Sequence, residues 1–176
     1  MKREFSAGGI VFNSKGEVLL VSAGSLRDES KLHWKFPKGH IDPGETTKDA
    51  AVREVHEESN VKAKIISKVG ESKYVFPMRG ERIFKIVTYF LMEYVSGELK
   101  PQEIEVEEVR WVSPNEALKL LSFSPDRQLL KKALALGIAL FFLMAEEFNL
   151  TGILIAFLAV VLIAPAILTR LPFPSI

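Results

Sequence analysis

The sequence predicts a mixed α/β domain, in which a sheet packs between helices, followed by an apolar tail. Segments rich in β-branched and aromatic residues alternate with segments of helical pattern, which favours an α/β sandwich. All but three of the Asp, Glu, Lys and Arg residues lie before residue 133. We therefore divide the chain into a charged domain, residues 1–132, and an apolar tail, residues 133–176.

The first elements are predicted from alternation and from turn residues. Residues 4–12 and 17–22 are predicted to be strands, because the turn cluster Asn-Ser-Lys-Gly separates them. Residues 32–36 are predicted to be a short strand that ends before a proline. The two prolines and two glycines of residues 37–44 predict a shaped loop.

A helix is expected after this loop, and a hairpin after the helix. Thr46 is expected to cap the helix together with Asp49, and Asn60 stands where a left-handed residue ends it. Strands are expected at 63–76 and 82–94, with a tight turn between them. The remaining elements of the domain are a strand at 106–112 and helices beginning near Pro114 and after Pro125.

The composition excludes several kinds of site and partner. The 23 Lys and Arg residues nearly balance the 22 Asp and Glu residues, whereas a protein that coats nucleic acid carries a large basic excess. We therefore expect no nucleic-acid partner. Cys is absent and His occurs only three times, so disulfides, thiolate sites and a histidine-rich zinc centre are not expected.

Carboxylates gather on one side of the predicted helix. On a helical wheel, where successive residues are about 100° apart, an arc of about 100° contains Glu54, Glu57 and Glu58. Like charges at these spacings repel, and a cation among them would offset that cost. Oxygen ligands without thiolates favour Mg²⁺ or Mn²⁺ over zinc. A solvated acidic helix face is the alternative that the spacing leaves open.

These carboxylates belong to a longer pattern. Gly39 is followed after five residues by Glu45, and after seven more by Arg-Glu-Val-His-Glu-Glu-Ser-Asn-Val at residues 53–61. This segment resembles the Nudix box, whose second glycine is replaced here by Asn60, a residue that also tolerates left-handed geometry. The resemblance covers residues 1–132 and implies a Nudix-type α/β/α sandwich with a mixed sheet.

The resemblance implies a divalent metal site. The metal-binding glutamates of the family match Glu54, Glu57 and Glu58, and a further ligand matches the Gly39 carbonyl. The expected ion is Mg²⁺ or Mn²⁺. In Nudix enzymes water attacks a phosphoanhydride phosphorus while divalent ions bridge the phosphates.

Other residues complete the expected site. Arg53 matches an arginine that orients a box glutamate, and Glu45 is its expected partner. Family members also recruit a glutamate outside the box, for which we favour Glu105 in the acidic run at 103–108. We expect Glu57 to be the general base.

The substrate class is indicated by residues outside the box. Residues 34–40, Trp-Lys-Phe-Pro-Lys-Gly-His, resemble the entrance of diadenosine tetraphosphate hydrolases. Lys38 and Lys85 are expected to hold a polyphosphate by charge-assisted contacts. Tyr74 and Phe76 are expected to stack on adenine, with ordinary sheet packing as the alternative for these two aromatic residues.

The expected activity is therefore Mg²⁺-dependent hydrolysis of dinucleoside polyphosphates, such as diadenosine tetraphosphate to ATP and AMP. One alternative is a pyrophosphatase acting on nucleoside triphosphates, nucleotide sugars or lipid-linked diphosphates. Another is a non-catalytic, membrane-tethered nucleotide sensor, which Asn60 favours and the retained glutamates disfavour.

The tail is expected to anchor the protein in a membrane. Residues 150–168 carry no charge, and as a helix they would span about 28 Å, close to the bilayer's hydrocarbon thickness of about 30 Å. Residues 133–145 are a second uncharged run. Either the two runs form a helical hairpin or a single span crosses at about 148–168, with the catalytic domain in the cytoplasm. The alternative is a buried hydrophobic hairpin in a soluble cytoplasmic protein.

Overall fold

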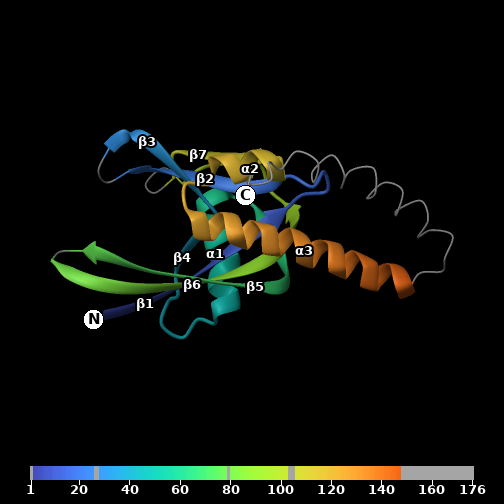
Figure 1. The fold of residues 1–176 in the computed structure, drawn as a ribbon, viewed down its shortest axis with the longest axis horizontal. Helices are drawn as coiled ribbons and strands as arrows, with labels where there is room; N and C mark the ends of the chain where they lie inside the picture. The colour runs from blue at the N-terminus through green and yellow to red at the C-terminus, as the bar shows by residue number, and fades with distance from the viewer. Residues whose placement is uncertain (1, 26–27, 79, 103–105, 148–176) are drawn as a thin grey trace, which may run out of the picture. The chain divides into compact units, whose positions relative to one another are not determined.

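The computed structural model describes residues 2–25, 28–78, 80–102 and 106–147 of the chain. The chain divides into two units, Met1–Leu134 and Ala135–Ile176, and the sheet belongs to the first (Figure 1). In chain order the elements are β1 (Lys2–Phe12), β2 (Val18–Ser25), β3 (Asp28–Lys35), β4 (Lys38–His40), α1 (Thr47–Ser59), β5 (Lys62–Met78), β6 (Glu81–Ser96), β7 (Glu108–Val112), α2 (Pro114–Leu120) and α3 (Ser124–Glu147).

The strands form one mixed sheet, as the sequence predicts. Its order is β3-β2-β1-β6-β5, with β4 paired to β1 and β7 paired to β2. β1 runs parallel to β6, while the other strand pairs are antiparallel. The long hairpin of β5 and β6 turns at Gly80, whose φ of 82° lies in the left-handed region that favours glycine.

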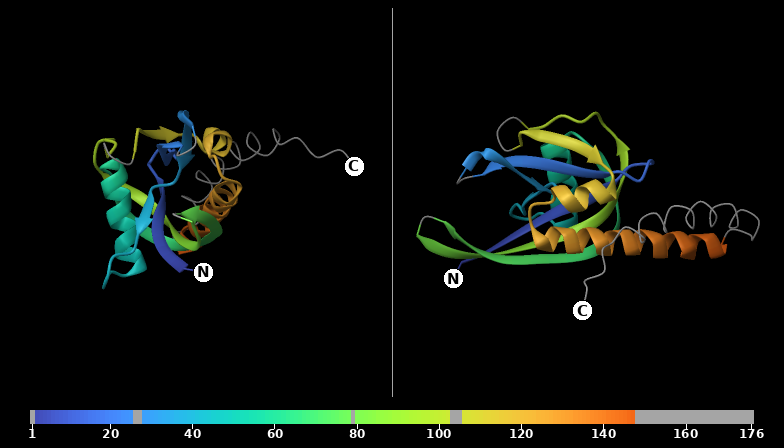
Figure 2. Two further views of the ribbon diagram at one scale, coloured as in Figure 1. Left: turned by 90° about the vertical axis from the view of Figure 1, so that its left-hand side faces the viewer. Right: turned by 45° about the horizontal axis from the view of Figure 1, so that its top comes forward.

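Helices cover both faces of this sheet (Figure 2). Helix α1 packs on one face, where Ala51 and Val55 meet Val11 of β1 and Met92 of β6 in a buried cluster. On the other face Leu129 of α3 lies against Gly70 of β5. A Cβ atom added at Gly70 would be 3.3 Å from Leu129 Cδ2. The first unit is therefore the expected α/β/α sandwich.

The boundaries of α1 are set by the residues that the sequence indicates. The Thr46 hydroxyl accepts a hydrogen bond from the Asp49 amide at 3.2 Å, which caps the helix. Asn60 ends the helix with a φ of 61°, the left-handed conformation that the usual glycine would supply. The departure from the box pattern thus leaves the helix end intact.

Three expectations about the elements need correction. The predicted loop at 37–44 contains a strand, β4, because Lys38–His40 pair with β1. The strand predicted at 32–36 begins earlier, at Asp28, where it pairs with β2. The helix expected after Pro125 continues to Glu147 through the uncharged run at 133–145, since that run contains residues of high helix propensity and no proline.

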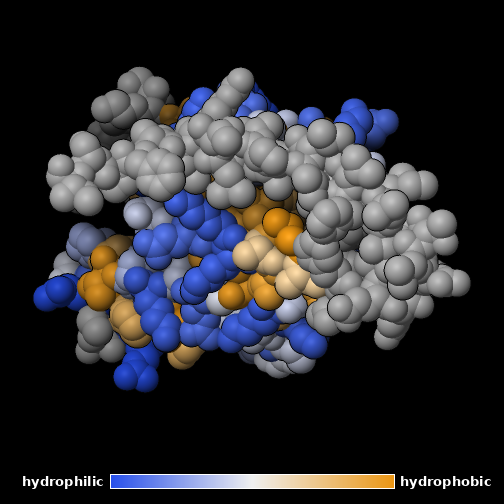
Figure 3. Space-filling view, turned by 45° about the vertical axis from the view of Figure 1, so that its right-hand side comes forward, coloured by the Kyte–Doolittle hydropathy of each residue, from blue (hydrophilic) through white to orange (hydrophobic). Residues whose placement is uncertain are grey.

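The described residues contain no helix with both the length and the apolar character needed to cross a bilayer. The uncharged run at 150–168 and the expected span at 148–168 lie outside the described residues. Hydrophobic side chains do reach the surface elsewhere. Figure 3 shows them among hydrophilic residues on one face of the described part.

Candidate active site

The segment before α1 that carries Gly39 and Glu45 is called the box loop here. Two glycines let it approach the sheet and helix α1. Gly8 of β1 pairs with Lys38 of β4, and a side chain at Gly8 would collide with the Pro37 carbonyl and the Lys38 side chain. A side chain at Gly39 would overlap the Glu54 carboxylate of α1. β4 is therefore held between β1 and the helix that carries the box glutamates.

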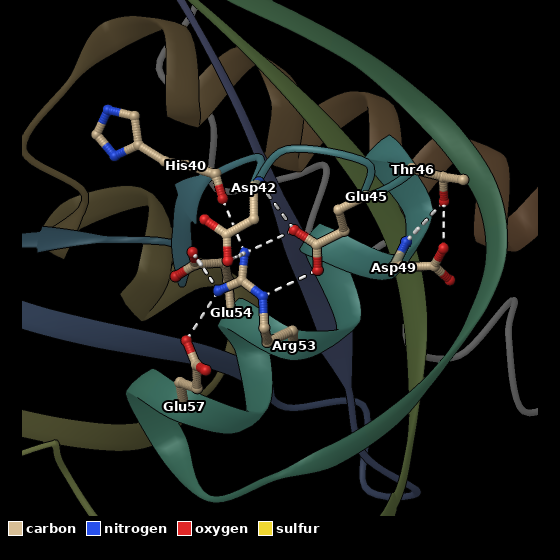
Figure 4. Close-up of polar contacts among 8 residues, drawn as sticks. All are labelled: His40, Asp42, Glu45, Thr46, Asp49, Arg53, Glu54 and Glu57. Atoms are coloured by element: carbon tan, nitrogen blue, oxygen red, sulfur yellow. Dashed lines mark hydrogen bonds and ion pairs between the residues drawn. The ribbon is translucent and has the colours of Figure 1, made fainter.

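The Arg53 guanidinium is the centre of the site (Figure 4). Its Nε and Nη2 donate to the two oxygens of Glu45 at 2.9 and 2.8 Å, a bidentate pair. Nη1 donates to Glu54 at 2.8 Å and to Glu57 at 2.9 Å. Nη2 also donates to the His40 carbonyl at 2.8 Å. One side chain thus ties the box loop to two box glutamates.

This network shifts the protonation equilibria of its members. The hydrogen bond from Arg53 lowers the pKa of Glu45 below its ordinary value. The hydrogen bond from Glu45, followed by that from Glu54, raises the pKa of Arg53. Both groups therefore keep their charges across the physiological pH range.

Glu58 points into a different environment from Glu54 and Glu57. Its side chain is buried, with Oε2 accepting from the Lys38 amide at 3.0 Å and Oε1 lying 3.7 Å from Lys35 Nζ. Burial raises the pKa of Glu58 despite the two lysines. The sequence places three carboxylates in one arc, but within the described residues no three Asp, Glu or His side chains form a metal-binding group.

The donors of the site nevertheless fit a hard divalent ion. Glu54 and Glu57 already converge on one positive atom, Arg53 Nη1, so their oxygens can share a cation. The side-chain ligands are carboxylate oxygens, which Mg²⁺ and Mn²⁺ prefer. The residues that would hold the ion are Glu54 and Glu57 with the Gly39 carbonyl and, after a change of rotamer, Glu58. Glu105 lies outside the described residues.

The four residues expected to bind substrate share one face of the sheet, opposite α1. In the strand registers Lys85 of β6 pairs with Glu4 of β1 and Tyr74 of β5. The Tyr74 and Phe76 rings lie 6.0 Å apart. Tyr74 is 38% exposed, so its ring does not lie in the core. Lys38 lies on this face too, because it pairs with Gly8.

The environment of Lys38 alters its protonation equilibrium. Burial, followed by the charge of Lys35, lowers its pKa to about 8. A lysine that is partly desolvated beside other cations binds an anion more strongly than one in water.

Sequence reasoning missed several residues of the site. Lys35, the partner of Glu58, is part of the segment at residues 34–40, but the resemblance implies no role for it. Asp42 lies 3.8 Å from Arg53 Nη2. The buried Asp126, in the first turn of α3, comes 65 positions after Val61, the last residue of the box pattern. Its only sequence signal is an acidic residue at a helix start.

Comparison with known proteins identifies the family. The family model described as the NUDIX domain matches residues 2–133. The chain belongs to the NUDIX family. The match covers the whole sheet and the first turns of α3 and so extends well beyond the box.

Individual relatives and solved structures are similar to this NUDIX chain. MutT4 of Mycobacterium tuberculosis is 34% identical over 134 residues, which cover 74% of this chain and 54% of that protein. The 8-oxo-(d)GTP phosphatase of Mycolicibacterium smegmatis is 31% identical over 99 residues, 56% of this chain and 29% of that protein. The chain thus spans about half or less of these curated relatives.

A crystal structure of the Caenorhabditis elegans Ap4A hydrolase in a binary complex has the same fold. Its TM-score is 0.63 with 26% sequence identity, and the match covers 77% of this chain and 98% of that one. The expected fold class is therefore confirmed for the NUDIX domain.

Proposed function

We propose that this NUDIX protein hydrolyses a phosphoanhydride bond of a nucleotide polyphosphate with the help of Mg²⁺ or Mn²⁺. The observation that carries this proposal is the Arg53 network, which orders Glu45, Glu54 and Glu57 next to β4, the strand that carries Lys38. A divalent ion would neutralise charge on the phosphates and activate water.

The residues of the site have distinct parts in the proposed reaction. Arg53, held by Glu45, keeps Glu54 and Glu57 in place. Glu57 is the more exposed of these two glutamates, with 45% of its side chain accessible, and it accepts a proton from water as general base. Lys38 and Lys85 hold the phosphates, so that the attacked phosphorus is positioned.

The substrate we propose is a dinucleoside polyphosphate, with diadenosine tetraphosphate giving ATP and AMP. The exposed Tyr74 beside Phe76 supports this choice, because adjacent rings on a sheet can stack on a base. The similarity to the Ap4A hydrolase fold supports it as well. The second candidate is a nucleoside triphosphate, which the similarity to an 8-oxo-(d)GTP phosphatase favours.

A substrate panel tests this proposal. Diadenosine tetraphosphate, ATP, dGTP and a nucleotide sugar are each incubated with the protein and Mg²⁺, and the products are identified by chromatography. We expect diadenosine tetraphosphate to give the highest kcat/KM, with ATP and AMP as products. A higher kcat/KM for a triphosphate would favour the second candidate, and no turnover of any compound would favour a nucleotide sensor.

We also propose that residues 150–168 anchor the protein in a membrane, with the NUDIX domain in the cytoplasm. The support is the sequence alone, nineteen residues without a charge.

A further inference from the structure

Two of the proposed metal ligands, Glu57 and Glu58, lie in the last turn of α1, which ends at Ser59. The last four carbonyls of a helix have no partner within the helix, and helix ends fray for that reason. A frayed turn cannot hold two carboxylates at fixed positions. The end of α1 therefore needs contacts from outside the helix if these two glutamates are to bind one ion.

Backbone contacts stabilise part of this helix end. The Asn60 amide donates to the His56 carbonyl at 2.7 Å, which the left-handed conformation of Asn60 permits. Residues 97–102 follow β6, and in this segment the Lys100 amide donates to the Ser59 carbonyl at 3.1 Å. Because both contacts involve backbone atoms alone, a glycine at position 60 would retain them.

The side chain of Asn60 adds a contact that glycine could not make. Its Nδ2 donates to the Glu98 carbonyl at 2.9 Å. Next to Glu98, the Gly97 carbonyl accepts from the Tyr94 hydroxyl of β6 at 2.9 Å. The Tyr94 ring packs edge-on against Trp111 of β7, with the ring centroids 5.5 Å apart. The Asn60 side chain thus connects the last turn of α1 to a segment that is held by two strands of the sheet.

The segment after β6 also lies very close to the backbone of Asn60. A Cβ atom added at Gly97 would overlap the Asn60 carbonyl oxygen, and Gly97 has a φ of 109°, in the region that favours glycine. Because both backbones are already fixed here, the hydrogen bond from the Asn60 side chain orders few additional groups. Its cost in conformational entropy is correspondingly small.

We propose that Asn60 is a positioning residue, whose side-chain amide holds the last turn of α1, and with it Glu57 and Glu58, in the arrangement that binds the divalent ion. The inference rests on the proposed function, since the ion belongs to the proposed site. When a ligand binds only the ordered form of a protein, its apparent affinity is reduced in proportion to the fraction that is ordered. Asn60 therefore raises the apparent affinity for Mg²⁺ by reducing fraying of the helix end.

The competing explanation is that Asn60 only supplies a left-handed backbone. Glycine adopts that conformation at a lower cost than asparagine. This explanation therefore predicts that Asn60→Gly, which restores the glycine of the box pattern, leaves the helix end as stable as before or makes it more stable. Our proposal predicts that the same substitution loosens the last turn.

The test is hydrogen–deuterium exchange of the full-length protein at increasing Mg²⁺ concentrations, with the same mild detergent in every sample. Without Mg²⁺, a peptide covering residues 55–61 should exchange about threefold to tenfold faster in Asn60→Gly than in the wild type, as expected for one lost hydrogen bond. Asn60→Asp keeps the size of the side chain and its tolerance of left-handed geometry but removes the donor, so it should behave like Asn60→Gly.

Added Mg²⁺ should slow the exchange of this peptide in the wild type and in both variants. The Mg²⁺ concentration at the midpoint of this effect should be about twofold to fivefold higher in the variants, because a smaller fraction of each variant is ordered before the ion binds. A purely structural role of Asn60 would not change this midpoint.

Asn13→Asp is the matched control. Asn13 Nδ2 donates to Glu17 at 2.9 Å, and both residues lie between β1 and β2. The same substitution therefore removes the same kind of donor at a place outside α1. It should leave both the exchange of the 55–61 peptide and its Mg²⁺ midpoint unchanged.

Wild-type exchange in both Asn60 variants, or a Mg²⁺ midpoint equal to that of the wild type, would overturn the inference. An equal acceleration in a peptide from the centre of β6 would indicate a general loss of stability and would overturn it as well. Absence of any Mg²⁺ effect in the wild type would overturn the inference together with the proposed metal site. None of these measurements depends on turnover, so a failure of hydrolysis contradicts the proposed function separately.

Discussion

The Glu54 carboxylate occupies the space that a side chain on Gly39 would need. Strand β4 and helix α1 therefore meet with only glycine between them, and the same carboxylate accepts a hydrogen bond from Arg53. The glycine of the box is thus explained by packing against a functional side chain, since the backbone of β4 is extended there.

Gly39→Ala should consequently lower kcat/KM with little loss of stability. The new methyl group displaces Glu54, and a displacement of about 1 Å in a catalytic site can cost about 100-fold in rate. Steady-state kinetics and thermal unfolding measure the two effects. Gly137→Ala is the control, because a side chain there meets nothing within 4 Å. Wild-type kinetics in Gly39→Ala would show that the position of Glu54 is unimportant.

Glu57→Gln and Glu58→Gln should each abolish most activity while the fold is retained. Glu57→Gln removes the proposed base and a metal ligand, and Glu58→Gln removes a second carboxylate but keeps an acceptor for the Lys38 amide. From sequence alone, relief of charge repulsion would make both variants slightly more stable. The ion pair with Arg53 already offsets the negative charge of Glu57. We therefore expect a gain in stability only for Glu58→Gln, which removes a buried charge. Loss of secondary structure in either variant would assign these residues a structural role instead.

Stability should depend on pH through Asp126. Burial raises the pKa of Asp126 from 3.8 to about 6. A group whose pKa is higher in the folded state contributes stability at low pH and loses that contribution as the pH rises through the folded value. The free energy of unfolding of Asp126→Asn, relative to wild type, should therefore increase between about pH 4 and pH 7, by at most about 3 kcal/mol. Urea denaturation at several pH values measures this, and a constant difference would contradict the buried, ionised state of Asp126.

The tail should be dispensable for catalysis. A chain ending at Glu147 retains the whole of α3, including the buried Leu129, Leu130 and Ala133, whereas a cut at Lys132 removes part of that packing. We expect the shortened protein to remain in the supernatant after ultracentrifugation and to keep the kcat/KM of the full chain. The full chain should require detergent for extraction from membranes. Aggregation of the shortened protein, with the full chain soluble in buffer, would show that the tail packs as protein core or interface.

The sequence predicts the parts of this structure that are governed by local patterns. β-Branched and aromatic residues locate the long strands, and Thr46 and Asn60 mark the two ends of α1. The spacing of the box predicts the pairing of Arg53 with Glu45, because the two residues are eight positions apart, one before and one after the start of α1. These features depend on neighbouring residues, which is why they can be recognised in one sequence.

Other features depend on contacts between distant segments. β4 forms only because Gly8, thirty residues earlier, allows Lys38 to approach β1. Glu58 is directed away from Glu57 by Lys35 and by the Lys38 amide, neither of which lies on its helix. The connection that leads into α3 is held to β3 by the Trp34–Ser122 hydrogen bond across 88 positions. No local pattern indicates these relationships.

The most direct test of the proposed hydrolysis is the fate of the water oxygen. The wild-type protein, Glu57→Gln and wild type with excess EDTA are each incubated with diadenosine tetraphosphate and Mg²⁺ in ¹⁸O-labelled water. Mass spectrometry of the products should find ¹⁸O in a product phosphate for the wild type alone. Equal ¹⁸O incorporation by Glu57→Gln, or incorporation that survives EDTA, would contradict the account.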